Sequence, residues 1–144
     1  MNPWLIAASS LLVLTALVHS LLGERLIFRR LRTSGWVPAE GGTLLQERHV
    51  RILWATWHLV SVLGACVAAV LAFVAFDPLP ATSLSDAVTA THDASADTLA
   101  RFCVQSAAIA AWLGSALVLI GTRGRHPGWL SLLLIGLFCQ IGLA

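Results

Sequence analysis

Long apolar runs alternate with short polar segments along the chain. There are four such runs, at about 3–22, 52–76, 99–121 and 127–143. A helix needs about 17–25 residues to cross a hydrocarbon core of about 30 Å. All four runs approach this length, and the last is barely long enough. In lipid, only helices and closed barrels satisfy the backbone polar groups, and runs this continuous predict helices. The pattern therefore predicts an all-α integral membrane protein with one domain, a four-helix antiparallel bundle.

The composition favours a bilayer over water as the solvent of this chain. Of 144 residues, 58% are hydrophobic and 11% are charged, whereas soluble domains carry about 25% charged residues. The formal net charge of +2 is too small to indicate nucleic acid as a partner. We therefore expect contact with the lipid bilayer, in a bacterial inner membrane.

The arginines predict how the spans are oriented. Six lie in the connection 23–51 and two in the connection 122–126, whereas the segment 77–98 contains four aspartates and no arginine or lysine. By the positive-inside rule, 23–51 and 122–126 are cytoplasmic, 77–98 is an outer loop, and both termini are periplasmic.

The connection 23–51 carries two helical signals. Residues 24–32 are expected to continue the first helix as an amphipathic cytoplasmic extension, with Arg25, Arg29 and Arg32 at helical spacing and able to lie against anionic headgroups. Thr43 and Gln46 fit a capping box, which predicts that the second helix begins near Thr43.

Small residues recur at every fourth position on the second and third spans. They are Gly64, Ala68 and Ala72 on one, and Ser106, Ala110 and Gly114 on the other. In lipid, such ridges let helix backbones approach closely. We expect these two spans to pack against each other, or one of them against a second copy or a larger membrane complex.

Two histidines inside the spans are the main candidates for function. His19 lies six residues inside Arg25 and His58 seven residues inside Arg51, so both lie roughly 9–10 Å deep on neighbouring helices. Placing an ionisable group at membrane depth costs free energy, so a functional role is the default interpretation of such a residue. Two neutral imidazoles at the same depth in the membrane could serve as the two axial ligands of a non-covalent haem b, or as two of the ligands of a transition-metal ion, and we predict one of these roles.

His126 and Glu24 are additional ligand candidates near the same boundary. His126 opens the fourth span. Glu24 is rotated roughly 140° from His19 around the first helix, so a shared site requires unwinding near Gly23. Otherwise Glu24 is expected to pair with Arg48 or Arg51.

Glu47 and Arg51 are expected to form an ion pair that sets the charge at the mouth of the site. The cysteines Cys66, Cys103 and Cys139 are expected to be buried thiols, with a Cys103–Cys139 disulfide as the alternative.

Several functions are compatible with this site. A haem indicates electron transfer with a quinone or a partner subunit, and a metal indicates binding, sensing or transport. His19 and His58 also fit structural groups hydrogen-bonded to Ser or Thr across helices, or a protonatable, quinone-adjacent site. The alternative class is a cofactor-free accessory or oligomeric protein that acts through helix packing and lipid contact. The sequence contains no phosphate-binding loop or nucleophile elbow from which to predict a reaction.

Overall fold

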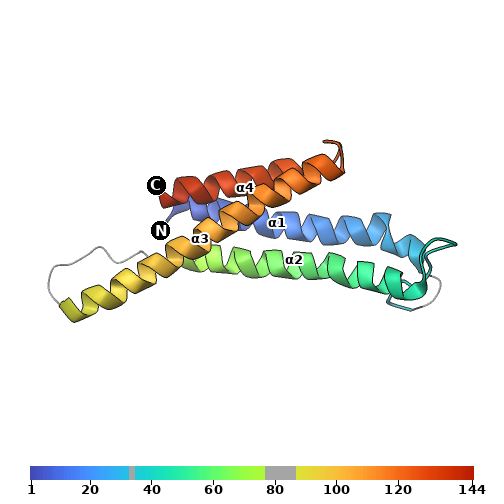
Figure 1. Cartoon of the computed structure of the whole chain (residues 1–144), viewed down its shortest axis with the longest axis horizontal. Coiled ribbons are helices and arrows are strands. Elements are labelled where there is room, and N and C mark those ends of the chain that lie inside the picture. The colour runs from blue at the N-terminus through green and yellow to red at the C-terminus, as the bar shows by residue number, and fades with distance from the viewer. Residues whose placement is uncertain (33–34, 77–86) are drawn as a thin grey trace. The chain divides into compact units, whose positions relative to one another are not determined.

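The computed structural model describes residues 1–32, 35–76 and 87–144, with backbone only for 87–95 (Figure 1). Within these ranges the chain is helical and contains no strand, which confirms the all-α prediction. The elements are the α-helix α1 (Pro3–Leu26), the short 3-10 helix η1 (Phe28–Leu31), and the α-helices α2 (Glu47–Phe76), α3 (Ala87–Gly121) and α4 (Gly128–Leu143).

Among the described residues, three helical segments are long and apolar enough to cross a membrane: α1, α2 and the part of α3 from Ala96 to Gly121. Helix α4 has 16 residues, which at 1.5 Å per residue is roughly 24 Å, short of a core of about 30 Å. The exposed surface of the helices is strongly apolar, with Leu117 and Ile120 more than 70% exposed. Extended apolar surface of this kind suits lipid rather than water, so these helices are compatible with a membrane protein.

The chain divides into two compact units. Unit 2, Val13–Cys66, contains the second half of α1, η1, the connection that follows it, and the first part of α2. Unit 1, Met1–Leu12 and Val67–Ala144, contains the start of α1, the end of α2, and both α3 and α4. Both α1 and α2 therefore contribute residues to each unit.

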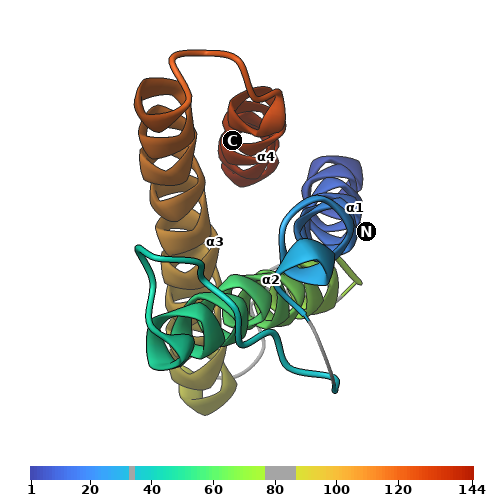
Figure 2. The same ribbon diagram turned by 90° about the vertical axis from the view of Figure 1, so that its right-hand side faces the viewer.

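The core of unit 1 consists mainly of small and medium-sized apolar side chains. Helices α3 and α4 lie side by side in it (Figure 2). Ser9 donates a hydrogen bond of 2.8 Å to the carbonyl oxygen of Ala68, which joins α1 to α2. The buried residues of this core are Leu5, Ala8, Leu71, Ala75, Val104, Ala108, Ala111, Ile135 and Cys139.

The buried ridge of α3 differs from the predicted one. Val104, Ala108 and Ala111 are buried, whereas Ser106 and Ala110 are exposed. The two ridges lie on different faces of the same helix, and spacing alone does not show which face a neighbour covers. The three cysteines are free thiols, so the alternative disulfide is not formed, but the expectation that all three are buried is wrong, because Cys66 is exposed and Cys103 only partly buried.

The element ends around the connection 23–51 also differ from the prediction. Helix α1 ends at Leu26 and the chain turns into η1, whose Phe28 is fully buried, so residues 24–32 do not form a continuous amphipathic extension. Helix α2 begins at Glu47 rather than near Thr43, because a backbone bridge between Gly41 and Leu45 closes a tight turn before it.

Helix α3 begins at Ala87, so the second half of the predicted outer loop, residues 87–98, is helical. Ser, Thr and Asp in this segment led to the prediction of a loop. The segment also contains four alanines between positions 87 and 96, and alanine is the strongest helix former. The first half of that loop, 77–86, lies outside the described residues.

Candidate functional site

In unit 2, α1 and α2 pack directly against each other around Trp57. The indole Nε1 donates a hydrogen bond of 3.0 Å to the carbonyl oxygen of His19, and the His19 ring stacks on the indole with centroids 4.2 Å apart. Gly23 permits this contact, because a Cβ at that position would overlap the indole. The buried ring of Phe28 meets the indole edge-on at 5.8 Å. Helix α1 therefore presents a close-packed face to Trp57.

His58, the next residue of α2, lies in a chain of polar contacts. Its Nδ1 is 3.0 Å from the hydroxyl oxygen of Ser20, and that oxygen lies 2.9 Å from the hydroxyl oxygen of Ser61. Each hydroxyl can donate or accept, so these contacts fit a hydrogen on Nδ1 as well as a hydrogen on Nε2. The other nitrogen, Nε2, faces Oε2 of Glu24 at 3.7 Å. Nε2 is therefore the ring nitrogen that faces the carboxylate.

Glu24 is held by partners from both sides. Its Oε1 forms an ion pair with the guanidinium of Arg32, and Trp54 donates a long hydrogen bond of 3.4 Å to Oε2. The Trp54 ring also meets the His58 ring edge-on, with centroids 5.1 Å apart. The carboxylate is thus about two-thirds buried among a cation, an indole and an imidazole.

The prediction that Glu24 pairs with Arg48 or Arg51 is wrong, because Arg32 is its partner. The turn after Leu26 brings Arg32 back beside the end of α1. A helix continued through this segment would have placed Arg32 with Arg25 and Arg29, which is why the sequence did not indicate its role.

The remaining predicted site residues have other contacts. Glu47 and Arg51 form the expected ion pair on the first turns of α2, with both side chains more than half exposed. His126 belongs to unit 1, where its Nδ1 accepts a hydrogen bond of 3.0 Å from the backbone N–H of Gly128 and so caps the start of α4. Of the predicted ligands, the structure therefore brings His58 and Glu24 together.

His58 and Glu24 resemble half of a metal site. Across the described ranges, no group of three or more His, Cys, Asp or Glu side chains is arranged to hold a metal ion. The separation of 3.7 Å between Nε2 and Oε2 is a few tenths wider than the roughly 3.4 Å between two ligands of a tetrahedral zinc ion. Each of the two side chains also has a polar partner at its other polar atom, Ser20 at Nδ1 of His58 and Arg32 at Oε1 of Glu24, an arrangement that is common behind metal ligands.

A haem between His19 and His58 would compete with the contacts just described. The Trp57 indole occupies one face of the His19 ring, and Ser20 is bonded directly to His58. A porphyrin between these helices would have to displace both contacts. The bis-histidine haem therefore stays a prediction that requires a different packing of α1 and α2.

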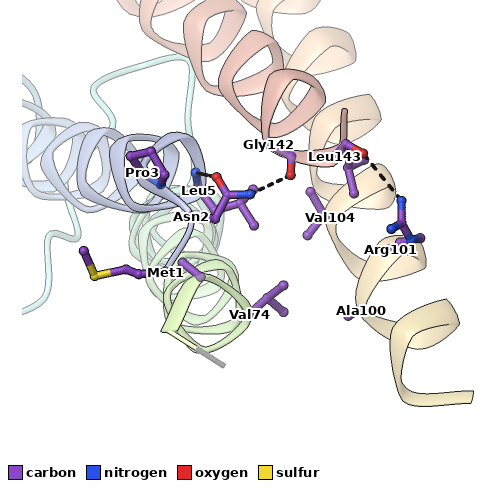
Figure 3. A pocket seen from close by; sticks show the side chains of 11 residues that line it. Met1, Asn2, Pro3, Leu5, Val74, Ala100, Arg101, Val104, Gly142 and Leu143 are labelled. Atoms are coloured by element: carbon purple, nitrogen blue, oxygen red, sulfur yellow. Dashed lines mark hydrogen bonds between the residues drawn. The ribbon is translucent and has the colours of Figure 1, made fainter. Parts of the chain in front are cut away.

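A separate cavity of about 310 Å³ lies in unit 1, between the start of α1 and the ends of α2 and α4, beside α3 (Figure 3). Its polar groups are already bonded: Asn2 donates to the Gly142 carbonyl at 2.7 Å, and Arg101 contacts Asp97 and the Leu143 carbonyl. None of the predicted site residues lines it.

In comparisons with protein-family models, with curated proteins and with solved structures, no match to this chain was found.

Proposed function

We propose that the protein is a polytopic membrane protein that binds a first-row transition-metal ion at His58 and Glu24. The observation that supports this function is the 3.7 Å approach of Nε2 to Oε2. With the ring hydrogen on Nδ1, two lone pairs face each other there, and a bound cation would satisfy both. An imidazole nitrogen and a carboxylate oxygen suit divalent ions such as zinc or iron.

Two protein ligands define an open site. Structural zinc sites close the shell with four protein ligands, whereas open sites leave positions for water or another molecule. We therefore propose reversible binding, as in sensing or transport, rather than a structural ion. Haem b with electron transfer to a quinone ranks lower, because it requires displacing the Trp57–His19 and Ser20–His58 contacts.

A specific observation favours a second candidate, the cofactor-free accessory or oligomeric membrane protein. Arg32 already pairs with Glu24, and a hydrogen on Nε2 of His58 would be donated to the same carboxylate. The network then closes without a ligand and acts as a polar contact that joins α1 to α2.

We also propose that α4 is a fourth span and that the four spans form an antiparallel bundle in a bacterial inner membrane. The support is the distribution of arginines, which favours cytoplasmic connections at 23–51 and 122–126 and termini outside. The short α4 can span by local thinning of the bilayer.

The test is metal binding by the chain purified in mild detergent. After loading and dialysis, the wild-type chain should retain about one ion, and Co²⁺ should give a visible absorption band. His58→Ala and Glu24→Gln should weaken binding at least tenfold, and Ser20→Ala about tenfold. His49→Ala removes an exposed histidine of α2 and is the matched control.

The metal-binding function and the cofactor-free function predict different results in these binding measurements. A wild-type chain that takes up no ion after loading, or variants that bind as well as wild type, would contradict the metal site. Loss of stability in His58→Ala without any bound ion in the wild-type chain would support the cofactor-free role. A Soret band that shifts on reduction would favour the haem.

A further inference from the structure

Two large apolar side chains project from the polar connection between α1 and α2. Trp36 and Leu44 are each 91% exposed. Trp36 lies in a bend directly after Gly35, which has a φ of +89°, and Leu44 lies inside the turn closed by the Gly41–Leu45 bridge. Elsewhere in the connection, the backbone N–H groups of residues 39 and 40 both donate to the Leu31 carbonyl at 3.0 Å. The two side chains therefore extend from a structured surface.

The same connection carries an excess of positive charge. It contains six arginines and three glutamates. Arg32 and Arg51 pair with glutamates. Across the described residues, no carboxylate pairs with the other four, which are exposed: Arg25, Arg29, Arg30 and Arg48. The net charge is therefore not neutralised within the described connection.

We propose that this connection surface, consisting of the four unpaired arginines with Trp36 and Leu44, binds the anionic headgroups of phospholipids. Arginines near an anionic membrane surface are attracted to it, and tryptophan is enriched at the depth of the headgroups. The connection joins two helices that are apolar enough to span a membrane, so it is already tethered beside the lipid. Insertion of the two apolar side chains removes them from water, while the arginines contact phosphates.

This surface is not the amphipathic helix expected from the sequence. Arg32 does not belong to it, because that side chain turns toward Glu24. Trp36 lies in a bend and Leu44 in a turn, and the exposure of both side chains depends on how the connection folds. The lipid proposal is also independent of metal binding, since none of its residues contacts His58.

The first test measures the depth of the turn that carries Leu44. In a variant whose three native cysteines are replaced by alanine, Leu44→Cys is labelled with an environment-sensitive dye and the chain is placed in nanodiscs. With phosphatidylglycerol present, the dye emission should shift to shorter wavelength and be quenched by lipid-borne quenchers. The matched control is Glu40→Cys, an exposed polar position of the same connection, which should be quenched by aqueous iodide.

The second test concerns charge. Arg29→Gln/Arg30→Gln should weaken lipid binding by roughly 25-fold, because each arginine near the surface contributes about fivefold in affinity. The phosphatidylglycerol fraction needed for half of the dye shift should therefore increase. Arg123→Gln/Arg125→Gln removes the same charge from the other arginine-containing connection and should leave the midpoint unchanged.

Three results would overturn the proposal. One is a dye at position 44 that stays in water in discs with anionic lipid. The second is an equal effect of the two arginine pairs, which indicates unspecific charge attraction. The third is a dye shift in neutral discs that appears only when two chains share a disc, which indicates contact between copies of the chain.

Discussion

The Nδ1 atom of His58 lies 3.0 Å from the hydroxyl oxygen of Ser20, so a hydrogen bond joins α2 to α1 within unit 2. Polar contacts between membrane helices contribute about 0.6 kcal/mol on average, so this bond alone adds little to stability. Its main consequence is orientation. With Nδ1 engaged, Nε2 is the nitrogen that faces Glu24, and the chemistry of the site depends on what lies between those two atoms.

The close packing of Gly23 against Trp57 leads to a stability prediction. Gly23→Ala places a Cβ where the indole lies, so α1 and the indole must separate. We expect a loss of about 1–3 kcal/mol in the free energy of unfolding, the usual range for overpacking, measured by SDS titration in mixed micelles. Gly121→Ala, at a helical position with open space around it, is the matched control. Equal stability of the two variants would contradict the Gly23–Trp57 contact.

The two glutamate ion pairs of unit 2 should differ in their energetic contribution. Glu24→Gln leaves the partly buried Arg32 without its anionic partner, and we expect a loss of about 1–2 kcal/mol. Glu47→Gln breaks a more exposed pair with Arg51 and should lower stability by less than about 0.5 kcal/mol. The same unfolding titration measures both. A larger loss for Glu47→Gln would contradict the assignment of Arg32 as the partner of Glu24.

Two neighbouring serines of α1 provide a matched pair in unit 1. Ser9 is buried and donates to the Ala68 carbonyl at 2.8 Å, whereas Ser10 is exposed. Ser9→Ala should lower the free energy of unfolding by about 0.5–1.5 kcal/mol, and Ser10→Ala should leave it within about 0.5 kcal/mol. If both changes are neutral, the hydrogen bond between α1 and α2 does not form in the membrane.

The proposed topology predicts the activity of fusions in a bacterial host. Alkaline phosphatase attached after Ala144 should be active, because it folds only outside the cytoplasm. Green fluorescent protein attached at the same point should be dark when exported by the general secretory route. A fusion truncated after Arg125 should show the opposite pattern. A fluorescent full-length fusion would place the C-terminus in the cytoplasm and reverse the proposed orientation.

The helices could be predicted from the sequence because the length of an apolar run is a local property. The runs at 52–76 and 99–121 fall within α2 and α3, and the three long helices match the expectation of spans. The ends of the helices could not be predicted as well. The start of α2 depends on the turn that the Gly41–Leu45 bridge closes, and the turn after Leu26 depends on burial of Phe28.

The candidate site was predictable in its residue types and only partly in its contacts. His58 and Glu24 could be singled out from the sequence because placing an ionisable group near hydrocarbon costs free energy. Both were predicted as candidate ligands of one site, but which of the candidates meet could not be predicted, since that depends on which faces of α1 and α2 are in contact. Arg32 reaches Glu24 because the helix ends six residues before it.

By itself, then, the sequence determined that this is a helical protein with membrane-length apolar segments, because chain composition and run length control transfer into lipid. The tertiary structure alone decided the partners: Ser20 for His58, Arg32 for Glu24, and Trp57 for His19. The physical reason is that these contacts need close packing between segments far apart in sequence. Such packing follows from the shapes of the facing surfaces, which run length and spacing do not determine.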